Sequence, residues 1–587
     1  MFKVSVGWPL ALCVLALVVV FMMLQPLAHG AGWSHSYSYN AVWILEFNDT
    51  LRRGIFPPRW LHGAFNGLGA PSFYFYPPLP FYLSALVGAF VRPGDHAAII
   101  AWTSFWMTLG SGAAMFAWLR GKAGDAWALV GAVLYVVAPY HQIDYFVRGA
   151  YGETAAYMML PLFMICLERA ARSRAWIPAL ALASAGLMLS HLLVTMLVIV
   201  SVLPVYGAFL IFTAPAAERP AVALRCLAGG VLGAALAATY LGPALLMQGA
   251  SSLNWMWGTR DADPYNWVLF RPDLWPQRNY ALEMAWLGWG VGAAGLAAVV
   301  AGLGRTMTRE RLEIVVAGGA VLLGFLLYGV PWVWHGPIGA VLGKAQFPYR
   351  LLVGMEFAAV TGVTLALAQG RWLRLAPLLL VGALLAKQGM DMAAVPIEFN
   401  RQQIGDLYGD TGRQVAMRRV PAEQLPGGFF ANSERWRADT AGMTGYDDLP
   451  LAAPENDGAR VTAASTFPDG TIAVAVSATR PTRIVVRRFF FPTWEVGLVR
   501  PGRDPVVRAE PVGLDRLLSF TAAPGQETYR IRIVRSPLEK ICDAISLVAL
   551  LGVLVWLGLS LRRCLLARSD DQGLQGRFRA FMRIRTR

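Results

Sequence analysis

One stretch near the N-terminus carries two carboxylates at a spacing that could do chemistry. Glu46 and Asp49 lie three residues apart, and either could act as the general base for an acceptor hydroxyl or help to hold a divalent cation such as Mg²⁺ or Mn²⁺. Alternatively, both are solvated on an amphipathic surface helix that buries Trp43 and Phe47, since charges at this spacing are common on helices. The sequence is compatible with both interpretations.

A second stretch places three charged side chains between two apolar runs, where an unpaired charge would be costly. Asp144, Arg148 and Glu153 lie within ten residues, and Asp144 is a further candidate base. The planar fork of Arg148 matches the oxygens of a phosphate, so this arginine could clamp a phosphoryl group. The alternative is a structural ion pair between Arg148 and Glu153 that fixes a helix end.

Polar groups also mark the ends of other apolar runs. His191 separates two such runs and could be a polar lid or a proton carrier, or a structural group at a helix end. Gln346, Tyr349 and Arg350 precede another run, and the charge of Arg350 beside a helix start would suit an anion. The alternative there is an interfacial anchor that involves Tyr349. The remaining candidates for substrate binding are His35 and Arg59.

The composition indicates which elements must position these groups. Of 587 residues, 56% are hydrophobic and only 15% are charged, which exceeds the apolar content of ordinary soluble domains and supplies repeated runs long enough to cross a bilayer. The net charge of +15 fits basic residues at the inner ends of membrane helices better than it fits nucleic-acid binding. The five cysteines show neither a disulfide framework nor metal-ligand spacing. We therefore predict a mainly α-helical polytopic membrane protein.

Twelve membrane-spanning helices are predicted, with both termini in the cytoplasm. The segment from Pro78 to Val91 is not counted, because its run of about a dozen apolar residues is shorter than the roughly 20 that a span needs. With this segment along the outer surface, the basic loops fall on the inner side, as the positive-inside rule requires. The predicted spans are 8–28, 98–118, 126–142, 153–168, 176–190, 192–213, 222–246, 282–303, 311–333, 351–368, 373–391 and 541–561.

A polar region precedes the last predicted span. After Gly470 the sequence alternates with the period of β-strands over 471–477, 483–489 and 528–534. Short strands separated by turns predict a small antiparallel sandwich, preceded by a mixed lead-in at about 395–465. The predicted organisation is a transmembrane domain at 1–391 with an outward loop at 29–97, an outward, periplasmic β domain at 392–540, the last span at 541–561 and a basic cytoplasmic tail at 562–587.

An ordered set of short motifs resembles one protein family, the bacterial polytopic membrane proteins described as 6-pyruvoyl-tetrahydropterin synthase-related. A segment at Phe490–Trp494 is also similar to one in the periplasmic domains of YfhO-type membrane proteins. The motifs are Trp43, Phe47, Leu51, Gly54, Pro58–Trp60, Gly67, Gly69, Pro71, Phe75–Leu79, Ala138–Tyr140, Arg148–Glu153, Ser190–His191, Tyr240–Pro243 and Gln346–Arg350.

The resemblance implies a layout like that of type C (GT-C) glycosyltransferases. That layout implies transfer of a sugar from a polyprenyl-phosphate donor to an envelope glycan, lipid or protein at the outer face of the bacterial inner membrane. In it, an acid soon after the first helix usually serves the acceptor. Relatives commonly carry Asp and His where this chain has Ser36 and Asn40, so Glu46, Asp49 or Asp144 would replace the usual carboxylate.

Two other functions fit the same layout. One is a non-catalytic assembly factor for envelope polysaccharide, which the loss of the usual acid at Ser36 favours. The other is a lipid or oligosaccharide transporter. A transporter is expected to carry charged or broken helices near the bilayer midplane, and the predicted spans are nearly free of such charges.

Overall fold

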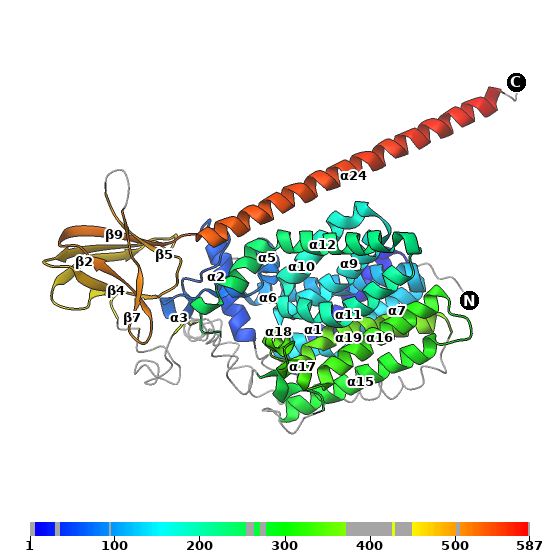
Figure 1. The fold of residues 1–587 in the computed structure, drawn as a ribbon, viewed down its shortest axis with the longest axis horizontal. Helices are drawn as coiled ribbons and strands as arrows, with labels where there is room; N and C mark the ends of the chain where they lie inside the picture. The colour runs from blue at the N-terminus through cyan, green and yellow to red at the C-terminus, as the bar shows by residue number, and fades with distance from the viewer. Residues whose placement is uncertain are drawn as a thin grey trace.

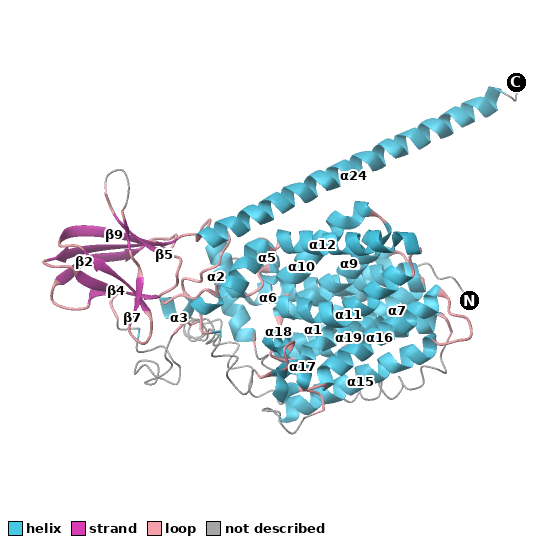
Figure 2. Cartoon of the chain, viewed as in Figure 1, coloured by secondary structure: helices cyan, strands magenta, loops and turns pink. Residues whose placement is uncertain are grey.

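The computed structural model consists of a helical bundle, a β unit of two sheets and a long C-terminal helix (Figures 1 and 2). It describes residues 6–29, 36–92, 96–253, 263–270, 278–370, 425–428, 446, 449–500 and 505–584. His35, the predicted span at 373–391 and most of the predicted lead-in at 395–465 lie outside the described residues.

The bundle is built from the apolar runs of the sequence. In hydrocarbon a backbone must satisfy its own hydrogen bonds, and an α-helix does so within one segment. Among the described residues, eight helices are long and apolar enough to cross a membrane, so a mainly helical membrane protein is confirmed, while the count of twelve spans stays a prediction. The main helices are α1 (Trp8–His29), α6 (His96–Ala123), α7 (Asp125–Val136), α9 (Tyr151–Arg172), α10 (Ile177–Ser190), α11 (Leu192–Phe212), α12 (Arg219–Leu236), α13 (Ala238–Leu246), α15 (Arg278–Gly302), α16 (Arg309–Gly329), α19 (Leu352–Ala368) and α24 (Pro537–Ile584).

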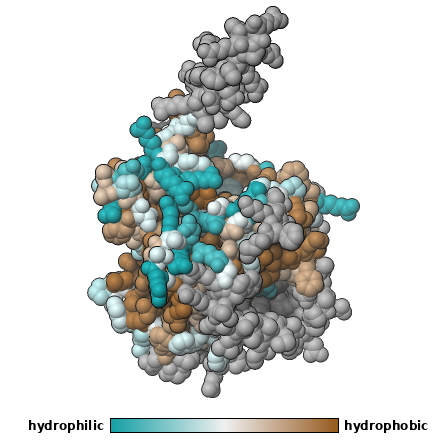
Figure 3. Space-filling model, turned by 90° about the vertical axis from the view of Figure 1, so that its right-hand side faces the viewer, coloured by the Kyte–Doolittle hydropathy of each residue, from teal (hydrophilic) through white to brown (hydrophobic). Residues whose placement is uncertain are grey.

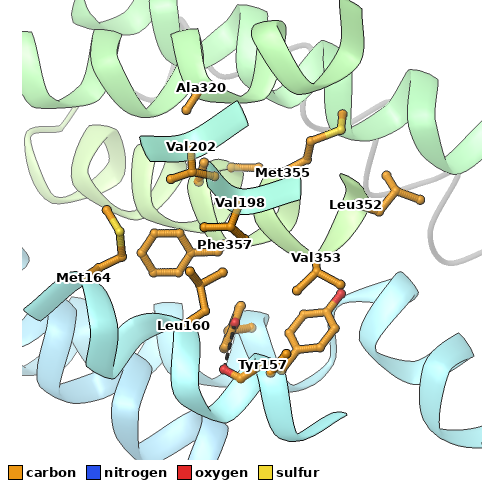
Figure 4. Close-up of a cluster of buried hydrophobic side chains, with 14 of the residues drawn as sticks. Tyr157, Leu160, Met164, Val198, Val202, Ala320, Leu352, Val353, Met355 and Phe357 are labelled. Carbon is orange, nitrogen blue, oxygen red and sulfur yellow. Dashed lines mark hydrogen bonds between the residues drawn. The ribbon is translucent and has the colours of Figure 1, made fainter. Parts of the chain in front are cut away.

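The helices α9, α11 and α19 share one apolar core (Figure 4). Leu160 of α9, Val198 and Val202 of α11 and Phe357 of α19 are all buried in it. Such interiors are close-packed, so a helix in contact with several others has little freedom to shift. The core therefore fixes the helix ends from which the predicted polar residues project.

The predicted span at 126–142 is wrong at its C-terminal end. Helix α7 ends at Val136 and is followed by the short helix α8 (Pro139–Ile143) and a π-helical turn, η1 (Asp144–Arg148). The cause is Pro139, because a proline ring disfavours helical backbone at the residue before it, and Ala138 accordingly has a ψ of 136°. The chain turns here and folds Asp144 and Arg148 back against the bundle.

The predicted span at 222–246 is divided into α12 and α13, with Ala237 between them. Pro243 lies inside α13 and has no N–H for the carbonyl of Thr239, four residues earlier. That carbonyl instead accepts a hydrogen bond of 2.7 Å from Nη2 of Arg59. The carbonyl that Pro243 leaves free in α13 thus binds Arg59, which lies in the segment that follows α2.

That segment contains four helices, α2 (Tyr37–Arg52), α3 (Ala64–Gly67), α4 (Ser72–Phe75) and α5 (Leu79–Gly88). Helix α5 has 10 residues, which at 1.5 Å each reach about half of the roughly 30 Å hydrocarbon thickness. It is therefore a short apolar helix, as its length in the sequence predicts. Its packing against α2 and α6 buries Phe81 and Gly88.

The β unit is an antiparallel two-sheet sandwich, as predicted. One sheet has the order β1-β4-β8-β7 and the other β2-β3-β9-β5-β6. Alternate residues of β3 and β4, such as Val474 and Ile484, point into the core between the sheets. The predicted lead-in extends too far, since β1 and β2 already belong to the sheets. The strands are β1 (Ala452–Pro454), β2 (Ala459–Thr466), β3 (Ile472–Ala478), β4 (Thr482–Phe489), β5 (Trp494–Leu498), β6 (Val506–Val507), β7 (Glu510–Val512), β8 (Leu517–Ala522) and β9 (Gly525–Ile533).

Aromatic contacts join the sandwich to the segment after α2. The Trp60 ring packs edge-on against Trp494, with centroids 5.5 Å apart, and Phe65 meets Phe489 at the same distance. The backbone N–H of Phe489 donates to the carbonyl of Leu68 at 2.8 Å. Sandwich and segment therefore share one continuous apolar core.

Candidate functional site

Most of the predicted polar residues meet at one end of the bundle, which we call the site end. The turn η1, the start of α9, the junction of α10 and α11 and the segment before α19 all lie there. The residues brought together are Asp144, Arg148, Glu153, His191, Gln346, Tyr349 and Arg350.

Arg148 makes the largest number of these contacts. Its Nη1 donates to Oδ1 of Asp144 at 2.6 Å, to Oε2 of Glu153 at 2.7 Å and to the hydroxyl of Tyr140 at 2.6 Å. Its guanidinium also lies 5.2 Å from the centre of the Tyr349 ring. Within the described part of the chain, Nε and Nη2 of Arg148 make no further bond, so they can donate to the oxygens of a ligand such as a phosphate.

Glu153 links Arg148 to a second arginine. Its Oε1 accepts a hydrogen bond of 2.9 Å from Nε of Arg350, which also donates through Nη1 to the carbonyl of Ala345. The predicted ion pair between Arg148 and Glu153 is therefore present, but as part of a larger network. Since Glu153 is saturated by cations, its main effect is to hold two guanidinium groups side by side.

His191 lies beside this network in a structural position. Its Nδ1 accepts the backbone N–H of Val194 at 3.1 Å and so caps the start of α11. Burial lowers the pKa of His191 to about 3, which keeps the ring neutral. A Cβ on Gly152 would lie 2.9 Å from this ring and 2.8 Å from the carbonyl of Ser190, so only glycine allows α9 to approach this closely.

Asp144 differs from Glu153 in having one carboxylate oxygen without a partner. Its Oδ1 accepts from Arg148, whereas its Oδ2 is buried and makes no hydrogen bond among the described residues. Burial raises the pKa of Asp144 well above its usual range; the charge of Glu153 adds to the shift and the guanidinium of Arg148 opposes it. A carboxylate of this kind can accept a proton from a hydroxyl group.

The segment that carries Arg350 is strained. Gln346 has a φ of 63° and a ψ of −51°, and the N–H of Phe347 bonds to the carbonyl of Ala345 at 2.7 Å. This is a γ-turn of the rare type, and backbone strain in proteins is concentrated at functional sites. The side chain of Gln346 accepts a bond of 3.2 Å from Nη1 of Arg350, so the turn orients the arginine.

Glu356 supports the site and is not among the sequence-predicted residues. Its carboxylate accepts the backbone N–H groups of Tyr140 and His141, at 2.7 and 3.3 Å, and the hydroxyl of Tyr157 at 2.7 Å. It thereby satisfies the start of α8 and holds it against α19. A single glutamate inside an apolar run is itself a signal of function or of a buried partner, and it could have been found that way.

The start of α2 closes the site from another side. The N–H of Ser36 bonds to the carbonyl of Arg148 at 2.9 Å, and Nδ2 of Asn40 bonds to the carbonyl of Gly149 at 2.5 Å. Oδ1 of Asn40 is buried and has no partner among the described residues. Ser36 and Asn40 therefore touch the turn that presents Asp144 and Arg148.

Glu46 and Asp49 occupy later turns of the same helix, six and nine residues beyond Asn40, or about 1.7 and 2.5 turns. Glu46 is buried, and its Oε2 accepts the backbone N–H of Gly63 at 2.8 Å. Asp49 is half-buried and forms an ion pair of 2.5 Å with Arg53. The expectation that α2 buries Trp43 and Phe47 is confirmed, but Glu46 is not on its solvated side.

Arg59 belongs to a separate polar cluster. It forms ion pairs with Glu539 and Asp543 at the start of α24, and it also bonds to Thr239. Glu539 is almost completely buried. Arg59 therefore ties the segment after α2 to α13 and α24, and its described contacts do not include the residues around Arg148.

An apolar groove of about 600 Å³ lies beside the site end. It runs between α5 and α6, with Met158 of α9 at its floor. Met158 follows Glu153 by five residues, or about 7.5 Å along the helix axis. The groove is open to the side, because the rings of Phe90, Trp102 and Trp106 on its rim are exposed.

Residues 73–395, more than half of the chain, match the family model described as the 6-pyruvoyl-tetrahydropterin synthase related domain, a membrane protein family. The chain belongs to this family. The match confirms the family resemblance and includes α5, η1, α9 and the segment around Arg350, so the site end of this family member lies inside the matched region. No curated protein matches the chain.

Two solved structures are similar in part to this member of the family. One is the arabinofuranosyltransferase AftD from Mycobacteria, with 14% identity, a TM-score of 0.38, and coverage of 67% of this chain and 27% of AftD. The other is a mutant of AftD, with 15% identity, a TM-score of 0.35, and coverage of 61% and 25%. The chain thus spans about a quarter of the length of these structures.

Proposed function

We propose that this protein is an integral-membrane glycosyltransferase that uses a polyprenyl-phosphate-linked sugar donor to modify an envelope glycan, lipid or protein. One observation carries the proposal: two arginines and a carboxylate with a free oxygen meet at a buried helix end beside an apolar groove. A donor of this class needs cations for its phosphate, an apolar path for its tail and a base for the acceptor.

Arg148 and Arg350 are the proposed phosphate ligands. Glu153 holds both guanidinium groups through one carboxylate, which fixes their geometry before a ligand arrives. Preorganised cations of this kind stabilise the charge that builds up on a leaving phosphate without a reorganisation cost. Gln346 and Tyr349 contribute by orienting Arg350 and flanking Arg148.

Asp144 is the proposed general base. The acceptor oxygen attacks the anomeric carbon from the face opposite the phosphate, and the bond between that carbon and the phosphate oxygen breaks. The bonding electrons leave with the polyprenyl phosphate, whose added charge faces Arg148 and Arg350. The acceptor proton passes to Oδ2 of Asp144, and the sugar is transferred with inversion.

The groove between α5 and α6 is the proposed path for the lipid tail. Its walls are apolar and aromatic, with Leu86 and Phe90 on one side and Trp102 and Trp106 on the other. The tail of a polyprenyl phosphate can enter it from the bilayer, since the rim is exposed. The donor then lies with its tail along α5 and its phosphate toward Arg148.

We place the site end and the sandwich on the periplasmic side of a bacterial inner membrane, with both termini cytoplasmic. The support is the distribution of charge. The ends of α6 and α9 and the start of α16, at the opposite end of the bundle, carry Arg120, Lys122, Arg169, Arg172 and Arg309. Basic residues collect on the cytoplasmic side of membrane proteins.

Envelope analysis of a deletion strain tests the proposal. Wild-type protein is expected to restore the missing glycan or glycolipid, whereas D144N, R148Q and R350Q variants of equal abundance should leave the lipid-linked sugar unspent. D457N is the control, because Asp457 is exposed on the sandwich. D49N should also restore activity, since Asp49 is paired with Arg53. Full restoration by D144N, R148Q and R350Q would refute the transferase.

A non-catalytic assembly factor is the second candidate function. It is favoured by the amide of Asn40 and the hydroxyl of Ser36, since the family resemblance implies an aspartate and a histidine at these positions. In that case the three variants would restore the glycan, and replacement of exposed sandwich residues would not.

A further inference from the structure

A second cavity lies at the opposite end of the bundle, which we call the basic end. Its volume is about 790 Å³, and it opens between the ends of α6, α9 and α19 and the starts of α1, α7 and α16. Figure 3 looks onto this end and shows hydrophilic side chains gathered on it. Five cations line the cavity together with four carboxylates, Asp125, Glu168, Glu310 and Glu313.

Three of the cations are neutralised within the protein. Lys122 contacts Glu168 at 2.7 Å and Glu313 at 2.5 Å, and its ammonium lies 4.3 Å from the centre of the Trp118 ring. Arg172 also pairs with Glu168. Arg120 is paired with Asp125 at 2.7 Å. These ion pairs fix the floor of the cavity, and they neutralise three of its four carboxylates, Asp125, Glu168 and Glu313.

The other two cations, Arg169 and Arg309, have no ion pair with a carboxylate among the described residues. Arg169 lies over the Trp176 ring at 4.4 Å, and Arg309 lies over the Phe209 ring at 5.8 Å. A guanidinium stacked on a ring keeps its N–H groups at the edge, where they can donate to an anion. The cavity therefore presents two positioned donors, with Glu310 beside Arg309 as the one lining carboxylate that forms no ion pair among the described residues.

The surroundings favour a lipid as the source of that anion. Trp8, at the start of α1, lines the same cavity. From there α1 presents exposed Leu10, Leu12 and Leu17 along its length. An acyl chain can follow this apolar surface into the bilayer while its headgroup stays at the cavity mouth.

We infer that the cavity at the basic end binds the headgroup of an anionic phospholipid, whose phosphate is held by Arg169 and Arg309. The site is separate from the proposed transferase site and does not depend on it. Basic pockets between membrane helices are a known form of lipid recognition, and each such arginine near the surface is worth about a factor of five in affinity.

Lipid binding by the full-length protein in neutral detergent tests the inference, with native mass spectrometry as the readout. Phosphatidylglycerol is expected to bind more tightly than phosphatidylcholine. The R169Q/R309Q variant should bind phosphatidylglycerol about 25-fold more weakly, as two factors of five imply. The R174Q/R305Q variant removes two exposed arginines that do not line the cavity and should bind nearly as well as wild type.

Three results would overturn the inference. The first is equal binding of the two lipids, and the second is an equal loss in both double variants, which would indicate surface charge alone. The third is displacement of the lipid by inorganic phosphate at millimolar concentration, which would indicate a soluble ligand. If the double variant does not fold, R309Q carries the same test, because Arg309 is exposed and its described contact is the Phe209 ring.

Discussion

Replacing Glu153 by glutamine should lower the stability of the folded protein far more than replacing Asp144 by asparagine. Glu153 is completely buried and accepts bonds from Arg148, Arg350 and Tyr140. A glutamine of the same shape leaves Arg350 without a carboxylate among the described residues. Breaking a buried ion pair by removing one partner costs about 3–5 kcal/mol.

The same reasoning gives a small cost for D144N. Burial raises the pKa of Asp144, so removing its negative charge costs less than removing a charge that the folded protein favours. Asparagine keeps an oxygen for Nη1 of Arg148 and loses only the strength of a charged acceptor, about 1 kcal/mol. The transferase proposal nevertheless requires that D144N lose at least about 100-fold in activity, because the base is gone.

Thermal denaturation of the purified variants, followed by fluorescence-detected gel filtration in one detergent, compares the two. We expect E153Q to melt several degrees lower than D144N. The E153Q/R350Q variant should recover part of the loss, because it removes the unpaired cation, and the coupling between the two positions should exceed about 1 kcal/mol. Two results would show that Glu153 is not the residue that holds the two arginines. One is a melting temperature of E153Q within a degree of that of the wild type, and the other is a melting temperature equal to that of D144N within the experimental error.

Three further predictions concern close packing and pH. G69A should weaken docking of the sandwich by about 2–4 kcal/mol, because Gly69 has a φ of 85° and a Cβ there would lie 2.5 Å from the Trp60 ring. The matched control is G54A, since Gly54 has a φ of 79° but no atom within 4 Å of the added Cβ. The control should cost about 1 kcal/mol, and limited proteolysis measures both variants. G152A should lower the melting temperature more than G207A, since only the first places a Cβ against the Ser190 carbonyl and the His191 ring, and equal melting would contradict this. Burial, with the charge of Arg488, lowers the pKa of His62 from 6.5 to about 4, so the folded protein favours the neutral ring. Neutral His62 therefore contributes up to about 3 kcal/mol of stability above pH 6.5, and this contribution is lost as the pH falls toward 4. If H62Q shows the same pH dependence of proteolysis as the wild type, this prediction is wrong.

The bundle and the site end were largely predictable from the sequence because each depends on a local pattern. Long apolar runs form helices wherever hydrocarbon is the solvent. Polar residues at the ends of alternate runs must then share one side of the bundle, which is why Asp144, Arg148 and Arg350 could be grouped although they are far apart in the chain. The sandwich was visible for a similar reason, since strand alternation is also local.

Contacts between distant segments were not predictable in the same way. Arg59 was grouped with the substrate-binding residues, yet its partners are Glu539 and Asp543, 480 and 484 residues later. Nothing in the local sequence of Arg59 indicates that distance. Glu356 stands out in the sequence as a glutamate in an apolar run, but its partners were likewise hidden, because they include backbone N–H groups exposed only after Pro139 ends the preceding helix.

The segment from Ser36 to Gly88 connects the site to the sandwich through contacts at its start and in its middle. Its start bonds to the turn that presents Asp144 and Arg148 through Ser36 and Asn40. Its middle packs on the sandwich through Trp60. Because these contacts are buried and lie on one continuous piece of chain, a displacement of the sandwich has to move either the α2 start or the aromatic junction. The cost of breaking the junction, which G69A measures, therefore sets how firmly the sandwich constrains the position of the candidate base.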